Sequence, residues 1–441
     1  MCGIFGIYNK TPKKNMKNII KYLKNLQHRG RDGYGIVTYD NEKFYENKYK
    51  GIINTETTLF DFTRKIKMGI AHTRYTTSTK NINGNIPGIQ PLKKYIGSFL
   101  TYLVHNGNII NIKTHDTAYL FNLIHTYKGT FEEKLKYIID NVPAAYCLII
   151  IHNNSMYIIR DRFGIRPLCI GETKDNWFIS SESCSIPHDS YLRDVMPGEI
   201  IKISENKLKT IYQHPHAQLS LCSFELYYFL SDNSFVDGYY VKNVRKYLGY
   251  LLAKKEKIQD KGYIVIGIPQ TGISYGKEYA KYMKLKYQQL ICKNTNIGRT
   301  FILPTQENRI NECKKKFIYD KDKLKNQKII IVDDSIVRGN VIKSIIDNLK
   351  KCQVKEIHIR IPSPPVIDIC ELGIAIKTKK ELFAHNKSIQ EMTKELNIDS
   401  LEYLHLHEID FFPQNSYDQC FSSNIFDEIK KWKPIPISLS S

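Results

Sequence analysis

The sequence predicts an α+β half followed by an α/β half that is built on a parallel sheet. Short strand-like runs, broken by Gly, Asn, Asp and Pro, fill residues 2–213, where few segments have helical spacing. From residue 260 onward, strand patterns that are apolar throughout alternate with helical patterns, which is typical of a parallel sheet covered on both faces. The length of 441 residues is enough for two or three domains.

The first half begins with a strand at 2–8 (CGIFGIY) and a helix at 16–27, whose apolar residues have helical spacing. Further strands are predicted in the runs GIVTYD, MGIAHTRY, FLTYLVHNG, AYCLIIIH, SMYIIRD, WFISSES and GEIIKIS. A pair of helices at 116–127 and 131–140 interrupts them. The pattern changes near HPHAQ (214–218), so we expect the first domain to span residues 2–220.

The second half is predicted as an alternating series that spans residues 221–385. Its expected strands lie at 263–269, 290–293, 328–334 and 356–362, and its expected helices at 273–283, near 306–317, and at 340–351. Residues 386–441 are expected to form a helical and then irregular tail that is rich in Pro near its end.

The net charge of +21, from 65 Lys and Arg against 44 Asp and Glu, suggests an anionic partner. Only 13 of the basic residues are arginines, whereas nucleic-acid surfaces use Arg heavily. We therefore expect no nucleic-acid partner and ascribe most of the charge to compositional drift, with a nucleic-acid-binding side role as an alternative. No apolar run approaches the roughly 18–20 residues of a membrane span, and no secretory signal begins the chain. Ten scattered cysteines fit a reducing cytoplasm.

The run IIIVDDSIVRGN (329–340) is the most informative segment of the second half. An apolar strand ends in Asp333 and Asp334, and a loop then opens a helix. This places two carboxylates at the carboxyl edge of a parallel sheet, where α/β proteins bind ligands. The loop amides can hold a phosphate at the helix N-terminus, and adjacent carboxylates suit ribose hydroxyls and hydrated Mg²⁺.

IVDDSIVRG resembles the phosphoribosyl pyrophosphate (PRPP) signature of type I phosphoribosyltransferases, in the form that amidophosphoribosyltransferases carry. The resemblance implies that Asp333 and Asp334 hold the ribose hydroxyls and the magnesium shell, with Thr271 of GIPQTG reaching the metal. It also implies a set of PRPP-binding residues in this loop and in a loop that folds over the substrate: Ser335, Ile336, Val337, Arg338, Gly339, Asn340, Lys293, Arg299 and Thr300. Gln270 and Gly272 stand where that family often has an acidic residue and Ser.

Cys2 is a candidate nucleophile in the first half. Removal of Met1 would make it the first residue, and its own α-amine, with a reference pKa of about 7.7–8.0, would serve as the base. Gly3 allows the backbone to approach a substrate closely.

HRGRDGYG, AHTRY, VHNGNI, RDRFGIRPL and ISSES occur in the order that resembles class II glutamine amidotransferases, which are N-terminal-nucleophile hydrolases with an αββα sandwich fold. By that resemblance, Arg74 binds the α-carboxylate of glutamine with His72 in the same pocket, and Asp116 holds the α-amino group. Asn106 and Gly107 form the oxyanion hole. His115 stands where the family has Ser, and RYTTST replaces RYPTAG.

Together the two resemblances imply a glutamine-dependent amidophosphoribosyltransferase. It would release ammonia from glutamine at Cys2, pass it through the interior to C1 of PRPP, and form 5-phosphoribosylamine, glutamate and pyrophosphate in the first step of purine synthesis. Glucosamine-phosphate synthases and asparagine synthetases share the first half, but no sugar-isomerase or ATP-pyrophosphatase pattern follows. A regulatory protein with a decayed PRPP site is a further alternative. The resemblance also implies a homotetramer or dimer inhibited by purine nucleotides.

Some members of this family carry a 4Fe–4S cluster on four cysteines. Cys222, Cys370 and Cys420 match three ligand positions, but Tyr417 occupies the fourth and only Met1 precedes Cys2 in place of a propeptide. We therefore expect Mg²⁺ as the cofactor and no iron–sulfur cluster. The linker at 224–238 resembles the family linker, except that Ser231 to Asn233 replace Arg-Pro-Asp.

Overall fold

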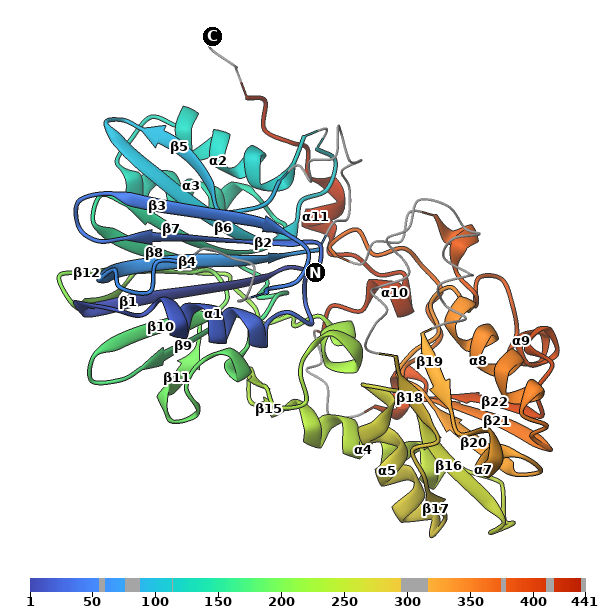
Figure 1. Ribbon diagram of the computed structural model, residues 1–441. Coiled ribbons are helices and arrows are strands. Elements are labelled where there is room, and N and C mark those ends of the chain that lie inside the picture. The colour runs from blue at the N-terminus through green and yellow to red at the C-terminus, as the bar shows by residue number, and fades with distance from the viewer. Residues whose placement is uncertain are drawn as a thin grey trace.

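The computed structural model describes residues 1–54, 60–75, 88–112, 114–294, 316–373, 378–409 and 416–437. The chain forms two lobes, a sandwich of two sheets and a smaller parallel sheet flanked by helices (Figure 1). Within the described ranges, no helix is long and apolar enough to cross a membrane.

The first lobe has two antiparallel sheets. The first sheet has seven strands in the order β11-β9-β10-β1-β4-β2-β3, and the second has six in the order β13-β12-β8-β7-β6-β5. The strands of the first sheet are β1 (Gly3–Lys13), β2 (Gly33–Tyr39), β3 (Phe44–Lys50), β4 (Ile66–Arg74), β9 (Cys169–Glu172), β10 (Asn176–Ser180) and β11 (Tyr191–Asp194). Those of the second are β5 (Leu92–Ile96), β6 (Phe99–Asn108), β7 (Ala145–His152), β8 (Ser155–Arg160), β12 (Glu199–Ser204) and β13 (Lys207–Gln213).

Helices cover both outer faces of this sandwich. α1 (Met16–Asn25) packs on the first sheet, and α2 (Asp116–Thr126) and α3 (Phe131–Asn141) pack on the second. A separate core, which includes Ile4, Val104 and Ile149, fills the space between the sheets. α3 begins with a capping box, in which Thr130 accepts from the Glu133 amide and Glu133 accepts from the Thr130 amide. The layers confirm the predicted αββα sandwich.

The second lobe contains a parallel sheet with the strand order β17-β16-β20-β21-β22. These strands are β16 (Tyr263–Gly267), β17 (Lys286–Tyr287), β20 (Lys328–Val332), β21 (Glu356–Ile361) and β22 (Ser400–Tyr403). The main helices are α4 (Val241–Lys254), α5 (Gly272–Met283), α8 (Asn340–Lys351) and α9 (Ile389–Leu396), and α7 (Lys321–Leu324) is a single turn.

Residues of the central strands alternate between two cores. Val265 and Val332 pack with α4 and α5, whereas Ile266 and Ile331 pack with α8 and α9. Because a strand presents successive side chains to opposite faces, a sheet covered on both sides needs apolar residues at every position. The predicted α/β half is therefore confirmed, and the carboxyl ends of β16 and β20 lie side by side.

Two details differ from the sequence prediction. The strand at 290–293 is present as β18 (Ile291–Lys293), but it pairs antiparallel with β19 (Phe317–Tyr319) instead of joining the parallel sheet. β22 lies within the predicted helical and irregular tail and pairs with β21. The helix predicted near 306–317 falls mostly outside the described residues. The domain boundaries at 220 and 385 stay predictions.

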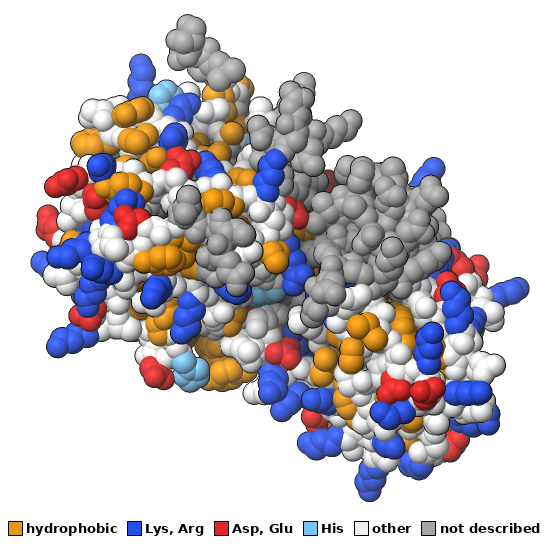
Figure 2. All heavy atoms as spheres, viewed as in Figure 1, with side chains coloured by type: hydrophobic (Ala, Val, Ile, Leu, Met, Phe, Trp, Pro, Cys, Tyr) orange, Lys and Arg blue, Asp and Glu red, His pale blue; other side chains and the backbone are white. Residues whose placement is uncertain are grey.

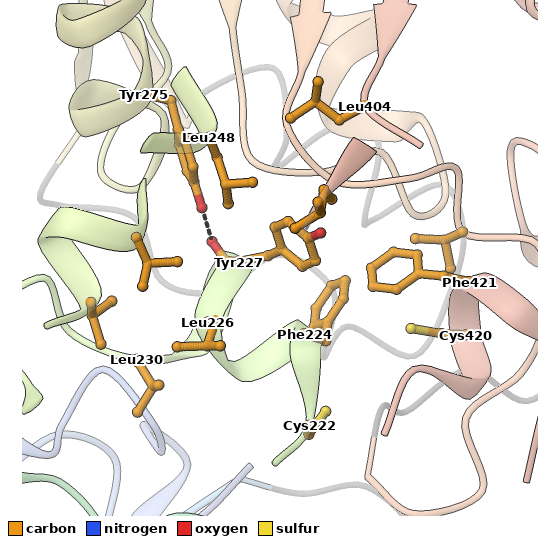
Figure 3. Close-up of a cluster of buried hydrophobic side chains, with 14 of the residues drawn as sticks. Cys222, Phe224, Leu226, Tyr227, Leu230, Leu248, Tyr275, Leu404, Cys420 and Phe421 are labelled. Carbon is orange, nitrogen blue, oxygen red and sulfur yellow. Dashed lines mark hydrogen bonds between the residues drawn. The ribbon is translucent and has the colours of Figure 1, made fainter. Parts of the chain in front are cut away.

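A buried cluster of side chains joins the two lobes (Figure 3). It centres on the linker, where Glu225–Phe229 forms a π-helical turn and β14 (Phe235–Val236) pairs with β15 (Tyr239–Tyr240). Tyr275 of α5 donates a hydrogen bond to the Tyr227 carbonyl, 2.9 Å away. Further members of the cluster come from the linker, both lobes and the tail, among them Leu221, Phe224, Leu226, Ile110, Ala145, Ile165, Leu248, Cys420 and Phe421.

The tail returns to the first lobe. After the short helices α10 (Gln419–Ser422) and α11 (Asp427–Lys431), Trp432 Nε1 donates to the Asn141 carbonyl over 2.9 Å. The Ile435 amide donates to the Tyr119 hydroxyl on α2 over 2.8 Å. Among the described residues, 3₁₀ turns lie at Ser183–Ser185, His188–Ser190, Lys379–Glu381 and Leu406–Glu408.

Lys and Arg side chains are scattered over both lobes on the face that Figure 2 shows. They alternate with acidic and apolar side chains and form no single continuous patch on that face. This distribution agrees with the interpretation of the +21 charge as compositional drift.

Candidate active site

Cys2 lies just before β1, at the end of the sandwich that faces the second lobe (Figure 1). The Tyr75 amide donates to the Cys2 sulfur over 3.5 Å, and the sulfur lies 3.8 Å from the Tyr75 carbonyl oxygen. Arg29 Nε donates to the Cys2 carbonyl over 3.0 Å. A Cβ on Gly3 would lie 2.7 Å from the Thr73 hydroxyl, so this position needs glycine. The thiol is therefore held beside the end of β4.

Arg74 and Asp116 are opposite charges that lie near one another, and Arg74 directly precedes Tyr75, whose amide bonds the Cys2 sulfur. Arg74 ends β4, and its Nη1 lies 3.4 Å from His115 Nε2. Burial, and then the Arg74 charge, lowers the pKa of His115 to about 4, so the ring is neutral and accepts from the guanidinium. Burial raises the pKa of Asp116 to about 6, although it accepts a 3.2 Å hydrogen bond from the Ile109 amide. A guanidinium and a carboxylate placed this close suit the carboxylate and the amino group of an amino acid.

His72 is fully buried in β4, two residues before Arg74. Neither ring nitrogen has a hydrogen-bond partner in the described part of the chain. Burial, followed by the charges of Arg74 and the neighbouring histidines, lowers the pKa of His72 well below its usual range. The ring is therefore neutral, and it lies on the same face of β4 as Arg74, two residues away.

Asn106 and Gly107 lie at the end of β6, which packs against β1 across the two sheets. Asn106 is 1% exposed, and its Nδ2 donates to no acceptor among the described residues. Burying an unpaired amide costs about 1–3 kcal/mol, which indicates a donor reserved for a ligand. A Cβ on Gly107 would lie 2.0 Å from the Ala145 carbonyl oxygen, so the backbone approaches β7 too closely for any side chain.

Asp333 and Asp334 follow β20 directly and are 8% and 5% exposed. The Thr271 hydroxyl donates to Asp334 Oδ2, and the Ser335 hydroxyl donates to Asp334 Oδ1, both over 2.5 Å. Burial raises the pKa of both carboxyls, and the neighbouring charge of Asp334 raises that of Asp333 further. The structure therefore brings Thr271 and the two acids together, as the sequence predicted.

The loop after these acids presents unused backbone donors. Among the described residues, no acceptor bonds the amides of Ser335, Ile336, Val337, Gly339 or Asn340. Gly339 precedes α8 with φ of 77°, and its missing Cβ would lie 2.8 Å from the Phe383 ring. Several free amides at a helix N-terminus form a phosphate site.

The side chains of the loop have different surroundings. Ile336 is 3% exposed and packs in the core beneath α8, so it can offer a ligand only its backbone. Arg338 Nε donates to Glu381 over 2.8 Å. A Cβ on Gly272 would lie 2.5 Å from the Val332 carbonyl oxygen, which explains why a side chain is missing there. Lys293 ends β18, whereas Arg299 and Thr300 lie outside the described residues.

The acidic pair fits a hydrated magnesium ion. Two buried carboxylates that repel one another are stabilised by a dication, and Mg²⁺ uses one or two protein carboxylates together with water and substrate oxygens. Across the described ranges, no group of three His, Cys, Asp or Glu side chains forms a metal cage.

The three cysteines do not fit a 4Fe–4S cluster. Cys222, Cys370 and Cys420 are all buried free thiols, and burial raises the pKa of Cys222 to about 12. Tyr417 lies against Cys222 through an isolated parallel bridge, and its hydroxyl donates to Gln419. Three thiols and a bonded phenol do not supply four thiolates. That no cluster forms stays a prediction.

Sequence reasoning missed the buried residues that support Cys2. Arg29 Nη1 donates to Glu182 over 2.6 Å and Arg29 Nη2 to Glu225 over 2.9 Å, and all three side chains are fully buried. Arg29 and Glu182 belong to the motifs HRGRDGYG and ISSES, so the motifs marked the right segments. Which charge pairs with which became clear only in the fold.

Known proteins with the name amidophosphoribosyltransferase align with nearly the whole chain. The protein of Methanocaldococcus jannaschii is 33% identical over 448 residues, which cover 92% of this chain and 93% of that protein. The Bacillus subtilis and Homo sapiens proteins are each 32% identical and each cover 91% of this chain and 87% of their own length. No family model matches the chain.

Solved structures that are similar to this chain point to the same family as the sequence matches. Glutamine PRPP amidotransferase from Bacillus subtilis, complexed with ADP and GMP, superposes with a TM-score of 0.83 at 30% identity and covers 96% of this chain and 97% of its own. A structure described as the allosteric regulatory enzyme of purine biosynthesis gives 0.86 at 30% identity, with 98% of each chain covered. The chain therefore belongs to the amidophosphoribosyltransferase family, the glutamine-dependent glycosyltransferases that catalyse the first step of purine biosynthesis.

Proposed function

We propose that this enzyme divides its reaction between Cys2 in the first lobe and the Asp333–Asp334 loop in the second. The observation that carries this assignment is the buried, unpaired amide of Asn106 on the strand that packs against β1, just after Cys2. Such an amide suits an oxyanion that appears only during attack on a carbonyl group.

At the first site, Cys2 attacks the side-chain amide carbon of glutamine. After removal of Met1, its α-amine takes the thiol proton and returns it to the leaving nitrogen, so that ammonia departs and a glutamyl thioester remains. Water then releases glutamate. Arg74 binds the α-carboxylate, a task that suits the fork of guanidinium donors. Asp116 binds the α-amino group, and His72 shapes the pocket floor.

At the second site, the amides between Ser335 and Asn340 hold the 5-phosphate of PRPP, and Asp333 and Asp334 hold the ribose hydroxyls. Asp333, Asp334 and Thr271 would hold Mg²⁺, which when bound offsets the charge of the pyrophosphate leaving group. Lys293, Arg299 and Thr300 are assigned to the same substrate. Ammonia displaces pyrophosphate at C1, and a site closed to water prevents hydrolysis of PRPP instead.

The apolar cluster between the lobes (Figure 3) supports a passage for ammonia through the interior. Its side chains come from both lobes and form an apolar region where the lobes meet. Neutral ammonia crosses such a region more readily than ammonium, because burial of a charge is costly.

Purine nucleotides are the proposed feedback inhibitors, since a solved relative was complexed with ADP and GMP. We also propose a homotetramer or dimer, on the family resemblance alone, and a cytoplasmic location. The location is supported by the nine described cysteines, which are all free thiols.

Replacement of Asn106 by alanine tests the glutamine site. We expect kcat for glutamine hydrolysis to fall by about 10²–10³-fold, because one oxyanion donor is lost, while KM for glutamine changes little. Steady-state glutamate production measures both. Asn141→Ala, on the exposed end of α3, is the matched control. An unchanged kcat in Asn106→Ala would remove Asn106 from the mechanism.

The pH dependence of glutamine use tests Asp116. Its pKa of about 6 means that the carboxyl gains a proton, and loses its attraction for the α-ammonium group, as the pH falls below 6. We expect kcat/KM for glutamine to fall about tenfold per pH unit there, since kcat/KM reports groups of the free enzyme. Asp116→Asn should lower kcat/KM at pH 8 and abolish this limb. A limb that persists in Asp116→Asn would belong to another group.

A further inference from the structure

A continuous run of polar contacts starts at the proposed nucleophile. Arg29 donates to the Cys2 carbonyl over 3.0 Å and also bonds Glu182 and Glu225 over 2.6 and 2.9 Å. Burial opposes ionisation of Glu182, but the charges of His28 and Arg29 outweigh it and hold the pKa of Glu182 well below its usual range. The Cys2 carbonyl is thus fixed by buried ionised groups that cannot move independently.

Glu182 also anchors the linker between the lobes. Its second carboxylate oxygen accepts from the Ser231 amide over 2.8 Å and from the Ser234 hydroxyl over 2.7 Å. These two contacts hold the linker on both sides of Asp232. A shift of the linker backbone at Asp232 would therefore act directly on the carboxylate that bonds Arg29.

Asp232 connects the linker to the second lobe. Its Oδ1 accepts from Arg245 Nη1 of α4 over 2.5 Å, and its Oδ2 accepts from the Ser274 hydroxyl in the first turn of α5. α5 begins at Gly272, directly after Thr271, whose hydroxyl bonds Asp334. The start of α5 thus bonds the linker carboxylate through Ser274, and the residue just before it bonds Asp334.

We propose that Asp232 is a positioning residue that links the occupancy of the PRPP site to the placement of Cys2. PRPP binding at Thr271 and Asp334 sets the first turn of α5. A displacement of this turn moves Asp232 through its bond to Ser274, and so moves the linker. Glu182 and Arg29, which are bonded to the linker and to each other, then shift the Cys2 carbonyl. The inference rests on the assignment of the two sites under Proposed function. It concerns one of the three positions, Ser231 to Asn233, where this linker departs from the family pattern.

Asp232 is a suitable residue for a test. Its side chain is 31% exposed, so its removal leaves no cavity in the core. Arg245 keeps two backbone acceptors, the carbonyls of Leu226 and Leu230. The neighbouring Asn233 is exposed and donates only its backbone amide, to Ser231, so Asn233→Ala is a matched control on the same turn.

The test measures binding with the catalytic thiol removed. In a Cys2→Ala background, the Kd for PRPP–Mg is measured with and without saturating glutamine, and the Kd for glutamine with and without PRPP–Mg. Linkage requires both ratios to be equal. We expect both to exceed fivefold in the parent, to fall by at least threefold in Asp232→Ala and Ser274→Ala, and to persist in Asn233→Ala.

Four outcomes overturn the proposal. The first three are equal ratios in Asp232→Ala and the parent, no coupling in the parent, and loss of coupling in the Asn233→Ala control. The fourth is that Asp232→Ala weakens PRPP binding by the same factor with and without glutamine, which would indicate a merely structural role. Ser274→Ala removes a single hydroxyl and decides the question if Asp232→Ala does not fold. Residual glutamine hydrolysis in the Cys2→Ala background would instead contradict the nucleophile assignment.

Discussion

Replacement of Cys2 by alanine is expected to abolish glutamine-dependent synthesis of phosphoribosylamine while ammonia-dependent synthesis persists. The thiol is the only nucleophile in the proposed first step, and loss of a catalytic nucleophile lowers the rate by about 10³-fold or more. Ammonia supplied at high pH bypasses the first lobe, so synthesis should stay within about twofold of the parent. The two rates are measured as pyrophosphate release with glutamine and with ammonium chloride.

Cys292→Ala is the control for this substitution. Cys292 is an exposed free thiol on β18 of the second lobe, so both rates should be retained. Intact-mass measurement of the parent should show the loss of Met1, because the α-amine of Cys2 is the proposed base. Glutamine-dependent activity in Cys2→Ala, or a fully active enzyme that retains Met1, would refute the nucleophile assignment.

Asp333→Asn and Asp334→Asn are expected to impair the PRPP site and spare the glutamine site, which is the opposite of the effect of Cys2→Ala. Synthesis should fall by about 10²–10³-fold with either nitrogen donor, because both routes use the same PRPP site. Basal glutamine hydrolysis should remain, since the first lobe is untouched. Asp347→Asn, on the exposed face of α8, is the control and should retain both activities.

Thermal unfolding tests the same acidic pair, because the direction in which Asp333→Asn changes the Tm can be predicted. The folded-state pKa of Asp333 lies well above its usual value because of burial and the nearby Asp334 charge. A carboxyl whose pKa is higher in the folded than in the unfolded state lowers the stability of the fold at neutral pH, so Asp333→Asn should raise the Tm in magnesium-free buffer. PRPP–Mg should stabilise the parent and have little effect on the variant. A lower Tm without magnesium would mean that the pair stabilises the fold and is not a strained ligand site.

The local motifs in the sequence were sufficient to predict much of the fold and the location of the site. MCGIFGIY, DDSIVRG and the alternating apolar strands carry their information within a dozen residues. Hydrophobic period determines whether a segment is a strand or a helix, and the end of a parallel strand determines where a ligand loop lies. This is why the α+β half, the parallel sheet and the place of Asp333 and Asp334 at its edge were predicted. The αββα sandwich and the grouping of Thr271 with the two acids followed from the family resemblance of the motifs.

Other features depended on partners that are distant in the chain. β22 is a four-residue strand, SLEY, and it belongs to the sheet only because β21 offers it an open edge. β18 has a strand pattern of its own, but its pairing with β19 rather than with the parallel sheet could not be predicted. A short strand has no stability alone, so the neighbouring strand decides where it lies.

The sequence by itself located the two proposed sites of this protein, a thiol at position 2 and a carboxylate pair before a loop that opens a helix, because both are encoded in contiguous residues. Only the tertiary structure decided how the two sites are joined. Arg29 reaches Glu182 and Glu225 across 153 and 196 residues, and Asp232 meets Ser274 across 42. Buried charges pair with whichever opposite charge the packed chain brings within bonding distance, and that choice depends on the whole fold.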